Sequence, residues 1–148
     1  MDLDTSLVRL DVEAHDAEDA IRLAGQILVD AGSATPSYVE AMVGAYRTLG
    51  PYIVLAPHVA MPHARPESGA IAEGVGVLRL LEPVAFGHAE HDPVRVVIAL
   101  VGADPNSHID LLRRISRALS DTRAMTTILE SDDAQEIAEL FNKGDLDE

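Results

Sequence analysis

The sequence contains no cysteine and only one lysine, and each scarcity excludes a kind of chemistry. A chain without cysteine has no disulfides, no thiolate zinc site and no cysteine nucleophile. The single lysine, Lys143, lies close to the C-terminal end, so the chain lacks the lysine that follows the glycine run of a P-loop and the strand lysine of a protein kinase. Phosphoryl transfer driven directly by a nucleotide is therefore not expected.

Positive charge is also scarce, because 25 acidic residues outnumber 11 Lys and Arg residues and give a formal net charge of −14. Such a chain cannot replace the counterions of nucleic acid or bind an anionic membrane, so neither partner is expected. No apolar run reaches the roughly 18 residues of a membrane-spanning helix, and the acidic start Met1-Asp2-Leu3-Asp4 is not a signal peptide. These features predict a soluble, cytoplasmic protein.

The expected architecture follows from the spacing of apolar residues in a chain of 148 residues, which fits one domain over residues 1–148. Helices are expected over 17–31, 36–49 and from Asn106 or Ser107 to about 119, and two more should begin at Asp121 and at Ser131 or Asp132 and end near 142–144. Strands are expected over 52–55, 59–61, 74–81 and 93–101, with an edge strand or irregular lead-in over 7–12. Helices around a block of strands predict a single-domain α/β three-layer sandwich, with a mixed sheet flanked by helices on both faces.

The acidic residues are distributed unevenly, and one long window contains none. Residues 41–66 carry no carboxylate, although an even distribution would place about four there, and the same window holds Arg47, His58, His63 and Arg65. A site for an anionic group would explain this pattern, because nearby carboxylates would repel the anion. The alternative is that the window consists of buried strands, which contain few polar residues of any kind.

Within this window, His63 stands between Pro62 and Pro66 in the segment Met61-Pro62-His63-Ala64-Arg65-Pro66. The two prolines restrict the backbone around the histidine before any ligand arrives. A positioned imidazole is useful as a nucleophile or a general base. An incidental histidine in a surface turn is the alternative interpretation.

His108 is the second candidate, because it falls in the first turn of the helix expected to begin near Asn106 or Ser107. Free backbone N–H groups and the helix dipole favour a bound anion there. The same dipole disfavours a charged imidazole and leaves a neutral ring that can donate one hydrogen bond. The alternative is that His108 only borders the apolar stripe of its helix.

Together these residues resemble the mannitol/fructose-type enzyme IIA domains of the bacterial phosphoenolpyruvate-dependent sugar phosphotransferase system (PTS). Arg47 stands sixteen residues before His63, and Asn106-Ser107-His108-Ile109 matches the later helix start of that family. The segments Gly50-Pro51-Tyr52-Ile53-Val54-Leu55-Ala56-Pro57 and Met61-Pro62-His63-Ala64-Arg65-Pro66-Glu67 are most similar to the ascorbate-specific branch.

The resemblance implies a phosphocarrier. The phosphocarrier protein HPr would phosphorylate His63, which would pass the phosphoryl group to a cysteine of a IIB component that serves a membrane IIC component. His108 would bond the phosphoryl oxygens and Arg47 would balance their charge. No metal, nucleotide or other cofactor is implied. Arg65 has no role in the mannitol-type pattern and is a candidate second phosphate contact.

Two other functions are compatible with parts of the sequence. A regulatory IIA module, whose phosphorylation state controls the binding of a partner, would use the same residues. A metal-binding protein would instead use His58, His63, His88 or His91. Ala64 stands where mannitol-type members commonly have Gly, which argues against mannitol or fructose specificity more than against phosphotransfer.

Overall fold

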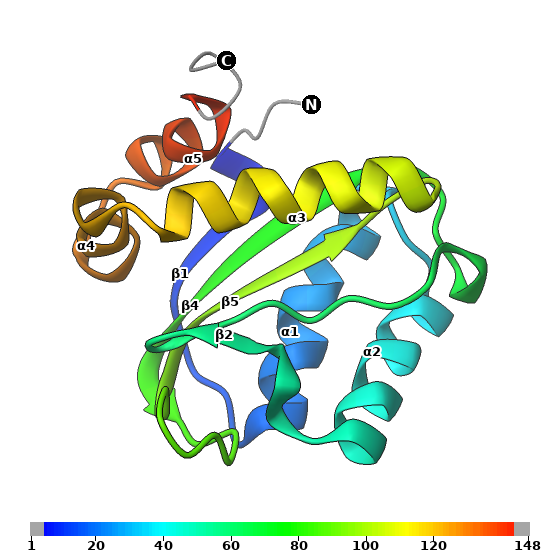
Figure 1. The fold of residues 1–148 in the computed structure, drawn as a ribbon, viewed down its shortest axis with the longest axis horizontal. Helices are drawn as coiled ribbons and strands as arrows, with labels where there is room; N and C mark the ends of the chain where they lie inside the picture. Colours follow the sequence, from blue (N-terminus) through cyan, green and yellow to red (C-terminus); the bar gives the residue numbers. More distant parts are fainter. Residues whose placement is uncertain (1–4, 144–148) are drawn as a thin grey trace.

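Five strands form one mixed sheet in the order β1-β4-β5-β3-β2, in a computed structural model that describes residues 5–143 (Figure 1). The strands are β1 (Val8–Val12), β2 (Val54–Ala56), β3 (Val59–Ala60), β4 (Gly74–Val84) and β5 (Val94–Val101). The pairs β1–β4 and β3–β5 are parallel, whereas β4–β5 and β2–β3 are antiparallel. The mixed sheet expected from the sequence is confirmed, and residues 7–12 contain an edge strand.

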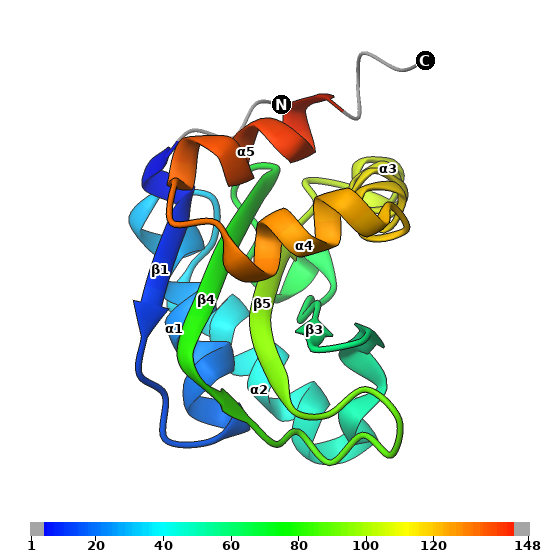
Figure 2. The ribbon, with the colours of Figure 1, turned by 90° about the vertical axis from the view of Figure 1, so that its left-hand side faces the viewer.

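Helices cover both faces of this sheet, as the views in Figures 1 and 2 show. On one face lie α1 (Ala17–Asp30) and α2 (Pro36–Leu49), and on the other lie α3 (Pro105–Leu119), α4 (Thr122–Glu130) and α5 (Ala134–Lys143). Short 3₁₀ turns at Thr5–Leu7, Pro51–Ile53 and Pro66–Ser68 complete the chain. The predicted three-layer α/β sandwich is therefore confirmed.

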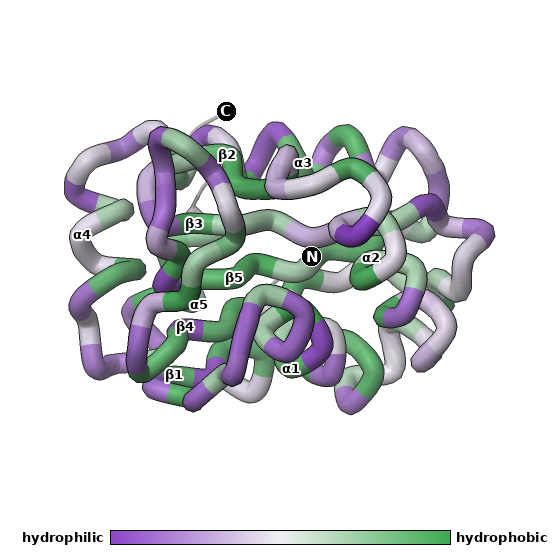
Figure 3. The backbone as a smooth tube through the Cα atoms, turned by 90° about the horizontal axis from the view of Figure 1, so that it is seen from below, coloured by the Kyte–Doolittle hydropathy of each residue, from purple (hydrophilic) through white to green (hydrophobic). Residues whose placement is uncertain are grey.

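The core is divided by the sheet into two apolar layers, because side chains alternate between the two faces of a strand. In β5, Val97, Ala99 and Val101 pack with α1 and α2. The intervening Val96, Ile98 and Leu100 pack with α3, α4 and α5. In Figure 3, hydrophobic colour runs along the central strands, whereas the helices carry mixed colour. A strand buried on both faces explains the nearly continuous apolar run between Val94 and Val101.

Most helix boundaries agree with the capping residues identified in the sequence. Asp16 caps α1 by accepting a hydrogen bond from the Asp19 backbone N–H at 2.9 Å. Pro36 is the first residue of α2, and Gly50, with a φ of 82°, ends that helix. Asp121 caps α4 as expected. None of the helices that the structure describes is long and apolar enough to cross a membrane.

Some boundaries were predicted wrongly. The cap of α3 is Asp104, not Asn106 or Ser107, because Asp104 and Ser107 form a reciprocal capping box with Pro105 as the first helical residue. Helix α5 begins at Ala134, later than Ser131 or Asp132 would give, and the Asp133 carboxylate bonds the Gln135 N–H. Strand β2 begins at Val54, because the preceding residues form a 3₁₀ turn. The acidic segment Met1–Asp4 and Gly144, the latest expected end of the last helix, lie outside the described residues.

Candidate functional site

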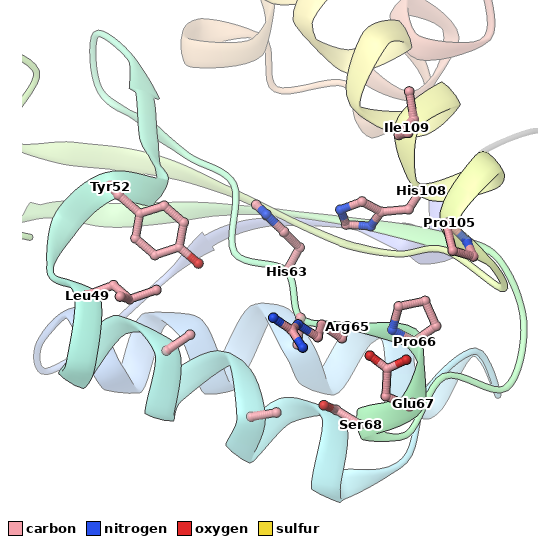
Figure 4. A pocket seen from close by; sticks show the side chains of 13 residues that line it. Leu49, Tyr52, His63, Arg65, Pro66, Glu67, Ser68, Pro105, His108 and Ile109 are labelled. Atoms are coloured by element: carbon pink, nitrogen blue, oxygen red, sulfur yellow. The ribbon is translucent and has the colours of Figure 1, made fainter.

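One pocket of about 680 Å³ lies where α2, the loop after β3 and the start of α3 meet (Figure 4). It is lined by Ala41, Ala45 and Leu49 of α2, by Tyr52, by residues 63–68, and by Pro105, His108 and Ile109 of α3. Eight of these 13 lining residues belong to the acid-free window 41–66. Glu67, just outside the window, is the one carboxylate among them. The depletion of acids therefore coincides with a pocket, which favours the site interpretation over that of buried strands alone.

The imidazole of His63 is half-buried and oriented by its own backbone. Its Nδ1 lies 2.9 Å from the carbonyl oxygen of Met61. Because a carbonyl oxygen only accepts hydrogen bonds, Nδ1 must carry the proton and donate it. Nε2 then keeps its lone pair, and it has no hydrogen-bond partner among residues 5–143. The ring of Tyr52 meets this imidazole edge-on, with centroids 6.3 Å apart.

The backbone on either side of His63 is fixed by hydrogen bonds. The Pro62 carbonyl accepts from the Leu100 N–H at 3.2 Å. The buried hydroxyl of Tyr38 accepts from the Ala64 N–H at 3.0 Å and lies 2.8 Å from the Leu100 carbonyl oxygen. Burial raises the pKa of the Tyr38 phenol, so this hydroxyl keeps its proton and can donate it. Helix α2 and strand β5 thus hold the loop that presents His63.

His108 lies across the pocket from His63, with the two ring centroids 5.1 Å apart and their planes inclined by 55° (Figure 4). Burial, and secondarily repulsion by a charged His63, lowers the pKa of His108. The imidazole is therefore neutral at neutral pH and carries one N–H donor. Its Nδ1 is buried without a hydrogen-bond partner, which is unusual for a polar atom. The pair of histidines expected from the sequence is brought together.

Gly102 allows the backbone of His108 to pack closely against the end of β5. A Cβ atom at Gly102, which follows β5, would lie 2.6 Å from both the backbone N and the Cα of His108. Real Cβ atoms essentially never approach other heavy atoms so closely. The first turn of α3 can therefore pack against the end of β5 only because residue 102 has no side chain.

The two arginines of the window have different positions. Arg65 lines the pocket. Arg47 does not, and its exposed guanidinium binds the Glu18 carboxylate of α1 through two hydrogen bonds of 2.7 and 2.9 Å. This contact lowers the pKa of Glu18. The role of Arg47 in balancing the phosphoryl charge stays a prediction, and in this structure its guanidinium is paired with Glu18.

The remaining histidines lie outside the pocket lining. His58 occupies the β2–β3 turn with its Nδ1 2.7 Å from the Pro93 carbonyl oxygen, and the rings of His88 and His91 stack 4.6 Å apart. Within residues 5–143, no group of three or more potential metal-ligating His, Asp or Glu side chains is found. The geometry therefore offers no support for the metal-site hypothesis.

Two tyrosines contribute to the site in ways that the sequence did not reveal. Neither Tyr38 nor Tyr52 was assigned a role at the site from the sequence, yet both contact the loop that carries His63. Exposed apolar side chains also border the pocket, at Leu49, Tyr52 and Ile109. In the sequence, these three apolar residues are marked only by their position within or beside the segments that carry the candidate polar residues.

Comparison with known proteins identifies the family. The family model described as "Phosphoenolpyruvate-dependent sugar phosphotransferase system, EIIA 2" matches residues 2–144. This chain belongs to that family. PTS EIIA components are phosphotransferase components that work through a phosphohistidine intermediate. The resemblance seen in the sequence is therefore confirmed.

Individual members of the PTS EIIA family agree with this conclusion. The ascorbate-specific PTS system EIIA component of Shigella flexneri is 33% identical over 137 residues, which cover 92% of this chain and 89% of that protein. The solution structure of the mannitol-specific cryptic enzyme IIA CmtB from Escherichia coli is 30% identical, covers 96% of this chain and 95% of its own, and has a TM-score of 0.84. The complex of enzyme IIA-Mtl with phosphorylated enzyme IIB-Mtl from Escherichia coli is 30% identical, covers 95% and 96%, and has a TM-score of 0.83.

Proposed function

We propose that this EIIA protein accepts a phosphoryl group from phospho-HPr on Nε2 of His63 and passes it to a cysteine of a IIB component. The observation that carries this proposal is the hydrogen bond from Nδ1 of His63 to the Met61 carbonyl. It fixes the tautomer in which Nε2 is the nucleophile, beside a pocket that has room for a phosphoryl group and for the reacting atom of a partner.

The transfer is an in-line exchange at phosphorus. The lone pair of His63 Nε2 attacks the phosphorus, and the N–P bond of phospho-HPr breaks with its electron pair moving to the departing nitrogen of HPr. His63 keeps its Nδ1 proton and becomes a phosphorylated imidazolium, which the Met61 carbonyl stabilises by accepting that proton in a hydrogen bond. In the second step a thiolate of IIB attacks the same phosphorus, and the electron pair of the breaking bond returns to Nε2.

His108 is suited to binding a phosphoryl oxygen during both steps. Its lowered pKa keeps the ring neutral, so it donates one N–H without competing as a second cationic group beside the imidazolium of His63. The first turn of α3, capped at Asp104, directs partial positive charge toward the same region. Positioning and electrostatic stabilisation are sufficient for this reaction, because the donor arrives already activated.

The transported sugar is proposed from relatives alone. Several proteins about one-third identical to this chain, including that of Shigella flexneri, are named ascorbate-specific EIIA components, so we propose ascorbate as the substrate of the coupled IIB and IIC components. We further propose a cytoplasmic location and a single EIIA domain over residues 1–148. A regulatory module would also be phosphorylated on His63 but would not deliver the group to IIB.

The test is a reconstitution with [³²P]phosphoenolpyruvate, enzyme I, HPr and purified IIB. We expect stoichiometric labelling of the wild-type chain, no labelling of His63→Ala, and transfer of label from wild type to IIB. Wild-type labelling without onward transfer would favour the regulatory module. Full labelling of His63→Ala would refute the assignment of His63, provided that circular dichroism shows the variant to be folded.

A further inference from the structure

The three tyrosines of the chain differ in what their hydroxyl groups bond. The hydroxyls of Tyr38 and Tyr46 each donate to a backbone carbonyl, at 2.8 and 2.6 Å. The hydroxyl of Tyr52 has no hydrogen-bond partner in the part of the chain that the structure describes, although this residue lines the pocket beside His63. The Tyr52 hydroxyl is therefore available to a ligand in the pocket.

Tyr52 flanks His63 on the side away from His108. Its ring meets the imidazole of His63 with centroids 6.3 Å apart and planes inclined by 76°, whereas the His108 ring lies 5.1 Å from the same imidazole. Figure 4 shows His63 between the two rings, with the Tyr52 hydroxyl turned toward the interior of the pocket. Tyr52 and His108 thus border from two sides the space into which a phosphoryl group on His63 would project.

The backbone of Tyr52 is connected to His63 through two successive hydrogen bonds. The Ile53 carbonyl accepts from the Met61 N–H at 2.8 Å, and the Met61 carbonyl in turn accepts from Nδ1 of His63 at 2.9 Å. Tyr52 is the middle residue of the 3₁₀ turn Pro51–Ile53, and the Ile53 side chain is buried in the core. The phenol and the imidazole are therefore carried by one fixed frame, so the hydroxyl loses little conformational freedom when it binds a phosphoryl oxygen.

The Tyr52 hydroxyl is suited to donating a hydrogen bond. Partial burial raises the pKa of this phenol, so the group keeps its proton at neutral pH. Hydrogen bonds to an ionised acceptor are roughly twice as strong as those between neutral groups, which favours a phosphoryl oxygen as the acceptor. Leu49, the lining residue nearest to Tyr52 in sequence, is apolar, so its side chain offers no competing acceptor.

We propose that the Tyr52 hydroxyl donates a hydrogen bond to a phosphoryl oxygen on His63, opposite the N–H of His108. This inference deepens the proposed function and rests on the phosphorylation of His63. Two neutral donors would then bind phosphoryl oxygens from two sides of the imidazole, in addition to the charge balance predicted for Arg47. Tyr52 forms a hydrogen bond only, and no covalent bond to it forms or breaks. The contact exists only after phosphorylation, so it stabilises the phosphorylated protein relative to the unphosphorylated one.

The equilibrium constant for phosphoryl exchange with HPr tests this proposal. A contact made only in the phosphorylated state changes that constant, whereas a group that only orients His63 for attack changes the forward and reverse rates alike. ³²P-labelled phospho-HPr is mixed with each variant, and the label on both proteins is measured at equilibrium. We expect Tyr52→Phe, which keeps the ring and removes only the hydroxyl, to lower the constant about 10-fold.

The matched control is Tyr46→Phe, which also removes one hydroxyl from the acid-free window. That hydroxyl bonds the Phe86 carbonyl and not the loop that carries His63, so the exchange constant should stay within about twofold of wild type. Circular dichroism verifies that both variants are folded. An unchanged constant for Tyr52→Phe, or an equal fall for both variants, would overturn the proposal.

A spectroscopic measurement separates this inference from the function on which it rests. Tyrosine labelled with ¹³C at Cζ gives three resonances, which the three Tyr→Phe variants assign. On phosphorylation the Tyr52 resonance should shift more than those of Tyr38 and Tyr46, and a Tyr52 resonance that stays in place in the fully phosphorylated protein would contradict the proposed bond. Failure of the wild-type protein to label would refute the proposed function instead. Inorganic phosphate titrated into that unphosphorylated protein should still shift the Tyr52 resonance, and the absence of that shift would overturn the inference as well.

Discussion

The hydroxyl of Tyr38 accepts a hydrogen bond from the backbone N–H of Ala64, the residue that follows His63, at 3.0 Å. The same oxygen lies 2.8 Å from the carbonyl of Leu100, which is 62 residues away in sequence. One buried atom of α2 therefore joins the loop that carries the proposed nucleophile to the C-terminal end of β5. This relationship makes the position of His63 depend on a residue that does not line the pocket.

Replacing Tyr38 by Phe tests that dependence. The variant keeps the ring but leaves the Ala64 N–H and the Leu100 carbonyl without this partner, so we expect the free energy of unfolding to fall by about 1–3 kcal/mol. We also expect labelling of His63 to slow roughly 10-fold, because the imidazole loses its fixed position. Urea unfolding and the reconstituted labelling assay measure the two effects.

The matched control is Tyr46→Phe. The Tyr46 hydroxyl also projects from α2, but it donates to the Phe86 carbonyl at 2.6 Å and not to the loop that carries His63. Tyr46→Phe should be less stable than wild type, but its His63 should be labelled at the wild-type rate. If both variants label at the wild-type rate, the Tyr38 hydroxyl has no part in positioning His63.

Replacing Gly102 by Ala tests the close approach of β5 and α3. The added methyl group would overlap the backbone of His108, so the start of α3 must shift, at a cost of about 1–3 kcal/mol in stability. We expect the His108 ring to move relative to His63 and transfer to IIB to slow. Gly44→Ala is the control, since nothing lies within 4 Å of its Cβ position, and in the interior of α2 it should raise stability by about 0.5–1 kcal/mol. Normal transfer by a folded Gly102→Ala would show that the distance between the two histidines is not critical.

The lowered pKa of His108 predicts a specific pH dependence of stability. Between the lowered pKa of the folded protein and the ordinary value near 6.5, the unfolded chain binds more protons than the folded one. Stability from this residue is therefore fully present above about pH 6.5 and is lost as the pH falls through the lowered pKa. We expect His108→Gln to lose less stability than wild type between about pH 7.5 and 5, as measured by urea unfolding. Identical slopes for the two proteins would contradict the burial of a neutral imidazole.

The Glu18–Arg47 pair predicts a salt-sensitive contribution to stability that is separate from function. Glu18→Gln should be less stable than wild type at low ionic strength, and the difference should shrink at about 1 M NaCl because the Arg47 side chain is exposed and that of Glu18 is partly exposed. Its phosphoryl-transfer rate should match that of wild type. A marked loss of transfer would show instead that the α1–α2 surface takes part in the reaction.

Much of the fold was predictable because its signals are local. Asp16 and Pro36 mark helix starts through contacts within one turn, and the valines of β5 mark a strand buried on both faces. The start of α3 was predicted wrongly, although the chemistry was also local. Asn106 and Ser107 are good capping residues, but Pro105 favours the first helical position and assigns the cap to Asp104.

The proximity of the two histidines could be predicted from the sequence, and the contacts of the arginines could not. His63 and His108 could be found from proline spacing and a helix start, whereas the contact of Arg47 with Glu18 depends on the rotation of α2 about its own axis. That rotation is set by packing of the opposite face against α1 and the sheet. The role of Tyr38 was beyond reach for a similar reason, because a contact across 62 residues has no local signal.

His63, the proposed nucleophile, lines one pocket that both the donor and the acceptor would have to reach, and this has a kinetic consequence. If Nε2 of His63 is the phosphoryl acceptor, HPr and IIB must both reach it through the surface around Leu49, Tyr52 and Ile109, and donor and acceptor then compete for the same area. Transfer then follows a ping-pong scheme in which one partner leaves before the other arrives. Unphosphorylated HPr becomes a competitive inhibitor of delivery to IIB, and the flow of phosphoryl groups through this protein falls whenever the donor pool is abundant but discharged.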